Sequence, residues 1–581
     1  MHKAKQNIIF GLLLVAIFIS AGVVWYSPVI FKGYNLLSDG SNVIVKAKNY
    51  NQTGIYGSEN DLNVIMSSSL IEQEGHESLQ GGKINGYLHS YLIKFTGEQT
   101  NSKLILSNIV ILALTLVLFA ITVYYLFNLT ITILFAAIYI FIPTIWLLPQ
   151  SFAEYEFSLF FLVIFFLLFT IGTNKLSLNK KSEDTKIISY NTALLVFSGA
   201  SLAMACLTKE ALLIFLPILF LFLLVYKQWR YLLYIFIPVV LVVAIFWLPG
   251  FVAGENIYLL SFTKDAPEEL KTSDFSYYAE FFPDPYTYHF NQEEYLNERT
   301  DLAQSVSSIR ADGIKRAMKL VGFADVTLFE RVKIGTGLFA KHSFRFLSIP
   351  EIGGPLIFIL MALGLVYLYK YKKEWFYFDV LWIIATMFLL SFVILGGRNH
   401  LMDFGWVIAS CAGLGIYILS KAISSTLFQN KYQNIILICL GLIVIYNLVV
   451  SSHVMWGLKY DNSPIPILDT YIEEIKNSNI ADDQIIAVPF DHPDDAYYIN
   501  LYTDKSLVVF KQATMQNLIE QNKVSDALEK FDVKYILGYT PDISARILDQ
   551  AEVGIIADST IEVNYEDYSL SNKGWFMNLV R

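Results

Sequence analysis

Residues 36–57, LLSDGSNVIVKAKNYNQTGIYG, follow closely on an apolar run near residues 7–26. A helix that crosses a bilayer needs about 20 mostly apolar residues, and this run is long enough. Asp39 therefore lies near the point where the chain leaves the membrane. A charged side chain at that depth is costly unless it is paired or faces water. The side of the membrane on which Asp39 lies decides how the rest of the chain is interpreted.

The composition is that of a polytopic membrane protein. The chain has 581 residues, of which 55% are hydrophobic and only 16% are charged, whereas soluble chains carry about 25% charged residues. A net charge of −9 argues against a nucleic-acid-binding protein. About eleven segments are apolar enough to be spans, and they lie near 7–26, 104–126, 129–149, 152–172, 191–208, 211–226, 231–250, 354–371, 376–396, 401–421 and 433–451.

Lysine and arginine residues are concentrated in alternate loops. With eleven spans these loops all fall on the side of the N-terminus, and they contain Lys3, Lys5, Lys175, Lys180, Lys181, Lys186, Lys227, Arg230, Lys370, Lys372, Lys373, Lys421 and Lys431. Because basic loops stay in the cytoplasm, we expect a multi-pass protein of the cytoplasmic membrane with its N-terminus inside. Three long segments then lie outside, at 27–103, 251–353 and 452–581.

The last outer segment has the pattern of a small α/β domain. We therefore divide the chain into a transmembrane domain, 1–451, and a soluble extracytoplasmic domain, 452–581. Within the latter, short apolar runs bounded by turn residues predict strands at 484–489, 506–510 and 533–539, and an amphipathic pattern predicts one helix at 513–530. This alternation favours a partly parallel sheet, and the residues from 560 onward suggest an antiparallel final strand.

Two further groups of residues have structural interpretations. Asp494 and Asp495, in the stretch HPDDAYY, are predicted to begin a helix in contact with solvent rather than to bind a metal. Cys206, Cys411 and Cys439 all lie in apolar runs, so we expect buried thiols and no disulfide framework.

Polar side chains also occur at three other predicted outer ends of the spans. SFAEYEFS (151–158) contains Glu154 and Glu156, CLTKEALL (206–213) contains Lys209 and Glu210, and GGRNHLMDF (396–404) contains Arg398, His400 and Asp403. Two positions on a helix that are two residues apart point to different faces, so we expect only one of the two glutamates to enter a shared site.

Each of these features has a simpler interpretation when it is taken alone. Asp39 is then a loop carboxylate or a helix cap, and Lys209 with Glu210 is a local ion pair in an interfacial hairpin. Arg398 is then a long side chain that extends to the interface. The functional interpretation rests on the four features together.

Carboxylates and cations at one membrane surface suit transfer from a lipid-phosphate donor. A carboxylate can take the proton of an incoming hydroxyl as general base. Arginine and lysine can stabilise the negative charge that develops on the departing phosphate. A donor with a long lipid tail would hold its headgroup at this depth.

Four stretches carry a resemblance to a known family. SDGSNVIVKAKNYNQTGIYG resembles the first outer loop of GT-C glycosyltransferases, in the branch that contains the protein O-mannosyltransferases and the lipid A aminoarabinose transferase. SFAEYEFSLFFLVIFFLLF is similar to the acidic start of a later span in that family, LTKEALLIFLP to its Leu-Thr-Lys hairpin, and GGRNHLMDFGWVIASCAGLGI to its late arginine hairpin. The resemblance covers roughly residues 1–450, and the layout of spans and outer C-terminal domain fits as well.

The resemblance implies an inverting transfer from a polyprenyl-phosphate sugar to a lipid, glycan or protein acceptor. By this comparison Asp39 is the catalytic base or a carboxylate linked to a divalent cation, and Glu154 or Glu156 is the second acid. Lys209 and Arg398, with His400 beside it, would bind the donor phosphate.

The sequence departs from the family in three places. Gly40 follows Asp39 where many relatives have a second acid, and the proline that usually follows the arginine hairpin is replaced. The Trp-Trp-Asp motif of oligosaccharyltransferases is absent, which argues against transfer of a whole glycan to asparagine. Two other classes stay open: a transporter or flippase of a lipid-linked substrate, and a non-catalytic scaffold that displays residues 452–581.

Overall fold

The computed structural model describes residues 2–32, 44–45, 47–48, 51, 64–65, 82–96, 101–151, 155–174, 185–209, 212–213, 215–225, 228–252, 336, 339, 353–388, 405–456, 465–478, 480–481, 484–490, 493–503, 505–510 and 512–557.

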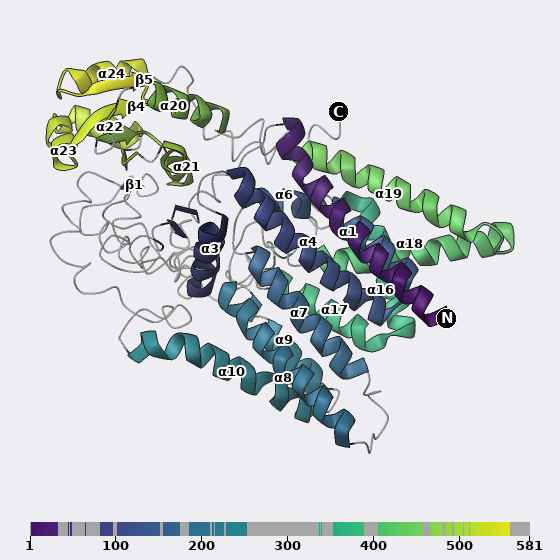
Figure 1. Cartoon of the computed structure of the whole chain (residues 1–581). Coiled ribbons are helices and arrows are strands. Elements are labelled where there is room, and N and C mark those ends of the chain that lie inside the picture. The colour runs from purple at the N-terminus through teal and green to yellow at the C-terminus, as the bar shows by residue number, and fades with distance from the viewer. Residues whose placement is uncertain are drawn as a thin grey trace.

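Apolar helices form a bundle, and a helix lies at each of the predicted spans (Figure 1). These are α1 (His2–Lys32), α4 (Asn101–Leu126), α5 (Leu129–Phe141), α6 (Pro143–Ser151), α7 (Tyr155–Asn174), α8 (Thr185–Thr208), α9 (Phe215–Val225), α10 (Trp229–Val252), α16 (Gly354–Tyr371), α17 (Lys373–Phe388), α18 (Gly405–Phe428) and α19 (Gln433–Trp456). Among the described residues six helices are long and apolar enough to cross a membrane, and four shorter helices are also apolar. The predicted class, a polytopic helical membrane protein with a C-terminal α/β domain, is confirmed.

Helix α18 lies at the centre of the bundle. About 67% of its apolar window is buried by other parts of the chain, compared with 17% for α1 and for α19. The expectation of buried thiols is confirmed for Cys206 and Cys411 but is wrong for Cys439, which is exposed on α19. In a helix whose outer face contacts lipid, an apolar sequence does not distinguish the buried face from the exposed one.

Glycines allow the backbones of neighbouring helices to touch. A Cβ atom at Gly364 of α16 would lie 1.9 Å from the carbonyl oxygen of Cys411, and one at Gly415 of α18 would lie 2.0 Å from that of Leu360. Close approach of this kind is how membrane helices gain packing energy, because lipid provides no hydrophobic driving force between them. Neither position can accept a larger residue without separating α16 from α18.

The predicted span at 129–149 is divided into α5 and α6. Pro143 lacks the backbone N–H that would continue the helix, and Ile142 is extended, with ψ of 122°. Trp25 of α1 donates from Nε1 to the carbonyl of Ile140 at 2.9 Å, and Trp146 of α6 donates to the carbonyl of Val24 at 2.7 Å. These two bonds attach α1 to the break between α5 and α6.

The C-terminal domain contains a parallel sheet with the strand order β1-β3-β2-β4-β5. Its elements are α20 (Ile465–Asn477), β2 (Ile485–Val488), α21 (Pro493–Thr503), β3 (Leu507–Val509), α22 (Gln512–Glu520), α23 (Val524–Lys530), β4 (Val533–Leu537), α24 (Pro541–Leu548) and β5 (Gly554–Ala557). The three predicted strands are confirmed as β2, β3 and β4. The expected antiparallel final strand lies outside the described residues.

Two local predictions for this domain need correction. The helix expected at 513–530 is two helices, because Asn522 between them has a positive φ of 56° and ends α22. The stretch with Asp495 does begin a helix, α21, but this side chain is 2% exposed rather than in contact with solvent. Helix α21 packs against α20.

The segment between α1 and α4 contributes to both parts of the protein. Its strand β1 (Val64–Ile65) pairs with β3 at the edge of the sheet. Its helix α3 (Gly82–Thr96) packs against α4 and α8 at the end of the bundle nearer the C-terminal domain (Figure 1). The N-terminus lies at the opposite end of the bundle, so this loop connects the membrane helices to the domain.

We predict that Gly364→Ala or Gly415→Ala destabilises the protein by about 1–3 kcal/mol, because the added methyl group would overlap a backbone carbonyl of the neighbouring helix. Gly22→Ala is the matched control, since a Cβ atom at this position meets nothing within 4 Å. Thermal unfolding of the purified protein in detergent measures the difference. Equal melting temperatures for all three variants would contradict the close contact.

A second prediction concerns Asp469 of α20, whose Oδ1 accepts a hydrogen bond from the Tyr498 hydroxyl at 2.9 Å. Burial raises the pKa of the Asp469 carboxyl, and the bond from Tyr498 lowers it in part. Below the unfolded pKa of about 3.9 the carboxyl is neutral in both states. As the pH rises through the higher pKa of the folded state, the folded domain must ionise this carboxyl and loses stability.

Asp469→Asn should therefore raise the melting temperature of the protein at pH 7, while this gain disappears at about pH 4. Asn keeps the oxygen that accepts from Tyr498. The control is Asp532→Asn, because the Asp532 side chain is 75% exposed beside Lys534. A lower melting temperature of Asp469→Asn at pH 7 would show that the ionised carboxylate stabilises the domain.

Candidate functional site

The structure describes two of the predicted site residues, Glu156 and Lys209. Asp39, Glu154, Arg398 and His400 lie outside the described residues, and so do the neighbouring Glu210 and Asp403. The geometry of the candidate site is therefore built from the helix ends that hold Glu156 and Lys209.

Glu156 is buried in the first turn of α7. Its Oε1 accepts a hydrogen bond of 3.3 Å from Asn108 Nδ2 of α4, which also donates to the carbonyl of Pro149. A carboxylate in the first turn of a helix is stabilised by the positive end of the helix dipole. The Glu156 side chain therefore points into the bundle, toward α4.

Lys209 follows the last residue of α8 and is 1% exposed. Its Nζ lies 3.5 Å from the centroid of the Tyr155 ring, the residue before Glu156. Its backbone N–H donates to Ala205 at 3.0 Å, so the ammonium group lies at the negative end of the α8 dipole. A cation over an aromatic face gains about 2 kcal/mol when it is desolvated. The ring of Tyr155 and the end of α8 together stabilise a buried positive charge.

The first outer loop lies beside this pair of charges. Ser90 of α3 donates from Oγ to the carbonyl of Ala47 at 3.3 Å, and Asn51 donates to the carbonyl of Ser90 at 3.1 Å. The adjacent His89 is fully buried and meets the ring of Phe157 edge to face at 5.1 Å. Phe157 follows Glu156 in α7, so α3 holds the loop next to the candidate site.

Asp39 lies a short distance along the chain from this attached segment. It precedes Ile44, which is fully buried, by five residues, a reach of at most roughly 18 Å. Ala47, one of the small residues on which the family resemblance rests, is also fully buried. Ala47 is attached to α3 through the hydrogen bond from Ser90, at the end of the bundle that holds Glu156 and Lys209.

Asn108, His89 and Ser90 were not predicted from the sequence as site residues. Asn108 had a usable signal, because it is a polar amide within an otherwise apolar part of α4. His89 had no such signal, because a polar residue does not stand out in the mixed polar and apolar sequence of α3. In the described part of the chain, no three His, Cys, Asp or Glu side chains lie together in a way that could hold a metal ion.

Comparison with solved structures gives the fold. The oligosaccharyltransferase AglB of Archaeoglobus fulgidus in its apo form superposes with a TM-score of 0.53 at 12% identity, over 93% of this chain and 71% of that one. The chain has the GT-C fold. The same archaeal enzyme in complex with an inhibitory peptide and a dolichol-phosphate gives a TM-score of 0.52 at 13% identity, over 90% and 69% of the two chains.

The chain is also similar to ArnT from Cupriavidus metallidurans bound to undecaprenyl phosphate, with a TM-score of 0.47 at 10% identity, over 95% of this chain and 90% of that one. No protein-family model and no curated protein sequence matches it. The resemblance to GT-C enzymes that the sequence motifs indicated is confirmed at the level of the fold.

We predict that the ring of Tyr155 holds Lys209 in place. Tyr155→Leu should lower the free energy of unfolding by about 2 kcal/mol relative to Tyr155→Phe, which keeps an aromatic face below the ammonium group. Thermal unfolding in detergent compares the two variants. Phe160→Leu on the same helix controls for the loss of an aromatic ring without a cation, and a similar loss in that variant would contradict the role of the ring.

Proposed function

We propose that the chain is a membrane glycosyltransferase that moves a sugar from a polyprenyl-phosphate donor to an acceptor on the outer face of the cytoplasmic membrane. One observation carries the proposal. Two buried ionisable residues meet at the start of α7: Glu156 is held there by Asn108, and Lys209 lies on the ring of the preceding residue, Tyr155. Charges buried there suit a charged headgroup whose lipid tail lies between the helices.

The reaction that we propose is a direct displacement at the sugar. Asp39 takes the proton of an acceptor hydroxyl, whose oxygen forms the new bond to the anomeric carbon. The bond from that carbon to the phosphate oxygen breaks, and the polyprenyl phosphate leaves with the electron pair. Displacement from the opposite face inverts the anomeric centre.

The remaining predicted residues act on the donor and on the base. Lys209 lies at a position where its positive charge can stabilise the departing phosphate, and Arg398 and His400 are proposed to join it from the α17–α18 hairpin. Glu156, already held by Asn108, is proposed to be the second acidic group that orients the acceptor or the base. Glu154 takes this role only if Glu156 has a purely structural one.

The nature of the donor is supported by the fold comparison. The archaeal oligosaccharyltransferase was solved with a dolichol-phosphate, which is a polyprenyl phosphate, and it shares its fold with this chain. The Trp-Trp-Asp motif is absent from this sequence. We therefore propose transfer of a single sugar rather than of a whole oligosaccharide to asparagine.

The proposal also places the two domains. Residues 1–451 form the catalytic membrane domain, and residues 452–581 form a domain on the same side of the membrane as the site. The pairing of β1 with β3 supports this arrangement, because it attaches the first outer loop to the C-terminal sheet. With the N-terminus inside, the domain lies outside the cell membrane, where it can cover the site or contact the acceptor.

The test uses undecaprenyl phosphate as a probe, because it carries the shared phosphate without requiring knowledge of the sugar. Lys209→Met should weaken its binding to the purified protein at least tenfold, which is about 1.4 kcal/mol, while undecaprenol without phosphate binds both forms alike. Lys534→Met, which changes an exposed lysine of the C-terminal domain, is the matched control. Equal binding by the wild type and Lys209→Met would remove Lys209 from the phosphate site.

Asp39→Asn separates binding from chemistry in the same experiment. It should keep undecaprenyl phosphate binding and membrane insertion but lower sugar transfer by about 100-fold or more. Full transfer by this variant would contradict its role as base. Movement of a lipid-linked sugar across proteoliposome membranes without any sugar transfer would instead show a flippase.

A further inference from the structure

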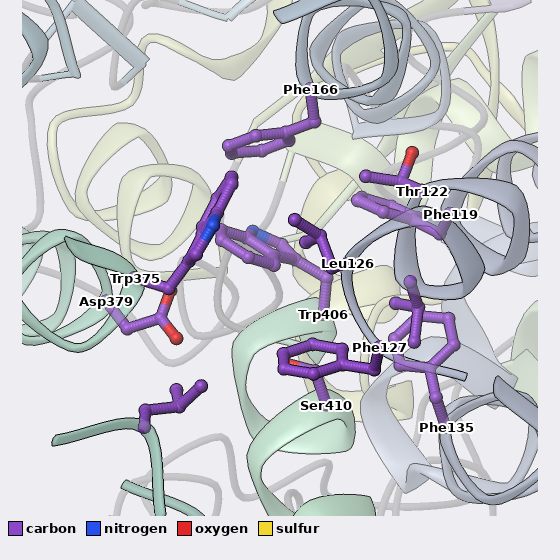
Figure 2. A pocket seen from close by; sticks show the side chains of 12 residues that line it. Phe119, Thr122, Leu126, Phe127, Phe135, Phe166, Trp375, Asp379, Trp406 and Ser410 are labelled. Carbon is purple, nitrogen blue, oxygen red and sulfur yellow. The ribbon is translucent and has the colours of Figure 1, made fainter. Parts of the chain in front are cut away.

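A second buried acid lies far from the candidate site, within the bundle. Asp379 is in the second turn of α17 and is 4% exposed. It lines a cavity of about 30 Å³ between α4, α5, α7, α16, α17 and α18 (Figure 2). The cavity also contacts Phe166, which is ten residues, or about 15 Å, further along α7 than Glu156. This pocket is therefore separate from the proposed transfer site.

The carboxyl group of Asp379 is incompletely satisfied. Among the described residues its Oδ1 has no hydrogen-bond partner, and its Oδ2 accepts only a long contact of 3.8 Å from Cys411 Sγ. A buried carboxyl without partners is costly in a membrane interior, where no bulk water reaches it. The position favours a bound group that can donate hydrogen bonds.

Aromatic rings form most of the pocket around this carboxyl. Figure 2 shows the indoles of Trp375 and Trp406 beside Asp379, with Phe127 and Phe119 on the side of α4. The faces of such rings are negative and attract cations, tryptophan most strongly. On the neighbouring surface, the ammonium group of Lys372 already lies 6.0 Å from the centroid of the Phe127 ring. The pocket thus combines a carboxyl group with several ring faces.

The walls discriminate between possible occupants. Their surface is almost entirely carbon, and the few polar groups include the carboxyl of Asp379 and the hydroxyl of Ser410. A metal ion such as Mg²⁺ or Ca²⁺ needs about six or more oxygen ligands, which one carboxyl cannot supply. A primary ammonium has three N–H donors. One can bind Asp379 and one can bind Ser410, whose own hydroxyl donates to Val407 at 3.1 Å and keeps free lone pairs.

Several wall residues lie at helix ends. Phe127 follows the last residue of α4, and Leu368 lies in the last turn of α16. Trp375 lies in the first turn of α17. These positions are near the end of the bundle opposite the C-terminal domain, where lipid headgroups and solutes are within reach.

We propose that this pocket binds a primary ammonium group, which enters from the membrane surface opposite the transfer site. The carboxylate of Asp379 pairs with the charge, Ser410 accepts a second hydrogen bond, and the rings of Trp375, Trp406 and Phe127 surround the remaining N–H. Its source is either a free small amine or the headgroup of an aminophospholipid. This inference does not depend on the proposed function.

Methylammonium is the probe for the test, with the full-length protein in nanodiscs of phosphatidylglycerol, which contains no amine. Addition of methylammonium at constant ionic strength should raise the melting temperature saturably. Asp379→Asn should raise the apparent Kd at least tenfold, or about 1.4 kcal/mol, because the amide removes the paired charge but keeps the shape. Glu374→Gln changes a carboxyl in the first turn of the same helix outside the pocket, and it should leave the response unchanged.

Further arms test the ring cage and the source of the ammonium. Tetramethylammonium has no N–H donor and is too large for the cavity, so it should bind at least tenfold more weakly. Trp406→Phe should weaken methylammonium binding while keeping a smaller ring. A weaker response in phosphatidylethanolamine nanodiscs assigns the site to a lipid headgroup, and an unchanged response assigns it to free amines.

Three results would overturn the proposal. One is the absence of a saturable response in the wild-type protein. The second is an Asp379→Asn variant with the same apparent Kd as the wild type, and the third is equal binding of methylammonium and tetramethylammonium. The melting temperature of Asp379→Asn without ligand shows whether that variant is folded, and Ser410→Ala provides a second, milder change in the same pocket.

Discussion

A bilayer interior offers no water to a buried charge, and this constraint determines how the chain arranges its few ionisable side chains. Glu156 receives a hydrogen bond from Asn108, and Lys209 lies on the face of Tyr155 at the end of α8. The amide of Asn108 in α4 stabilises Glu156, and the ring of Tyr155 in α7 together with the end of α8 stabilises Lys209. The helix bundle is therefore built around its polar positions as much as around its apolar contacts.

The membrane part of the fold followed from the sequence because the thickness of the bilayer sets the length of an apolar run. The strands β2, β3 and β4 followed from short apolar runs between turn residues. Helix boundaries that depend on a single residue were harder to predict. Pro143 divides one predicted span because it lacks a backbone N–H and follows the extended Ile142, and Asn522 divides one predicted helix through its positive φ. Strand β1 has two residues, which is too short for any periodic pattern.

The buried polar residues were only partly predictable, because the sequence does not show which way a side chain on a helix points. Polar residues at span ends can be recognised as exceptions, and Glu156 and Lys209, which the structure shows to be buried, were predicted as site residues in this way. Asp379 was missed because it follows Lys372 and Lys373 closely and so resembles an ordinary charge of a basic loop. The structure shows that Asp379 is buried, because α17 turns its side chain toward Cys411 of α18. The face of α17 on which Asp379 lies decides whether its side chain is buried, and in a uniformly apolar sequence the buried face cannot be recognised.

The pairing of Val64 with Leu507 has a consequence for biosynthesis. The two residues are separated by several hundred positions, so the ribosome completes every membrane helix before the partner of β1 is made. Until then β1 has no neighbouring strand. Assembly of the segment that contains β1 is in this sense postponed until the last domain folds, which links maturation of the proposed active site to synthesis of the complete chain.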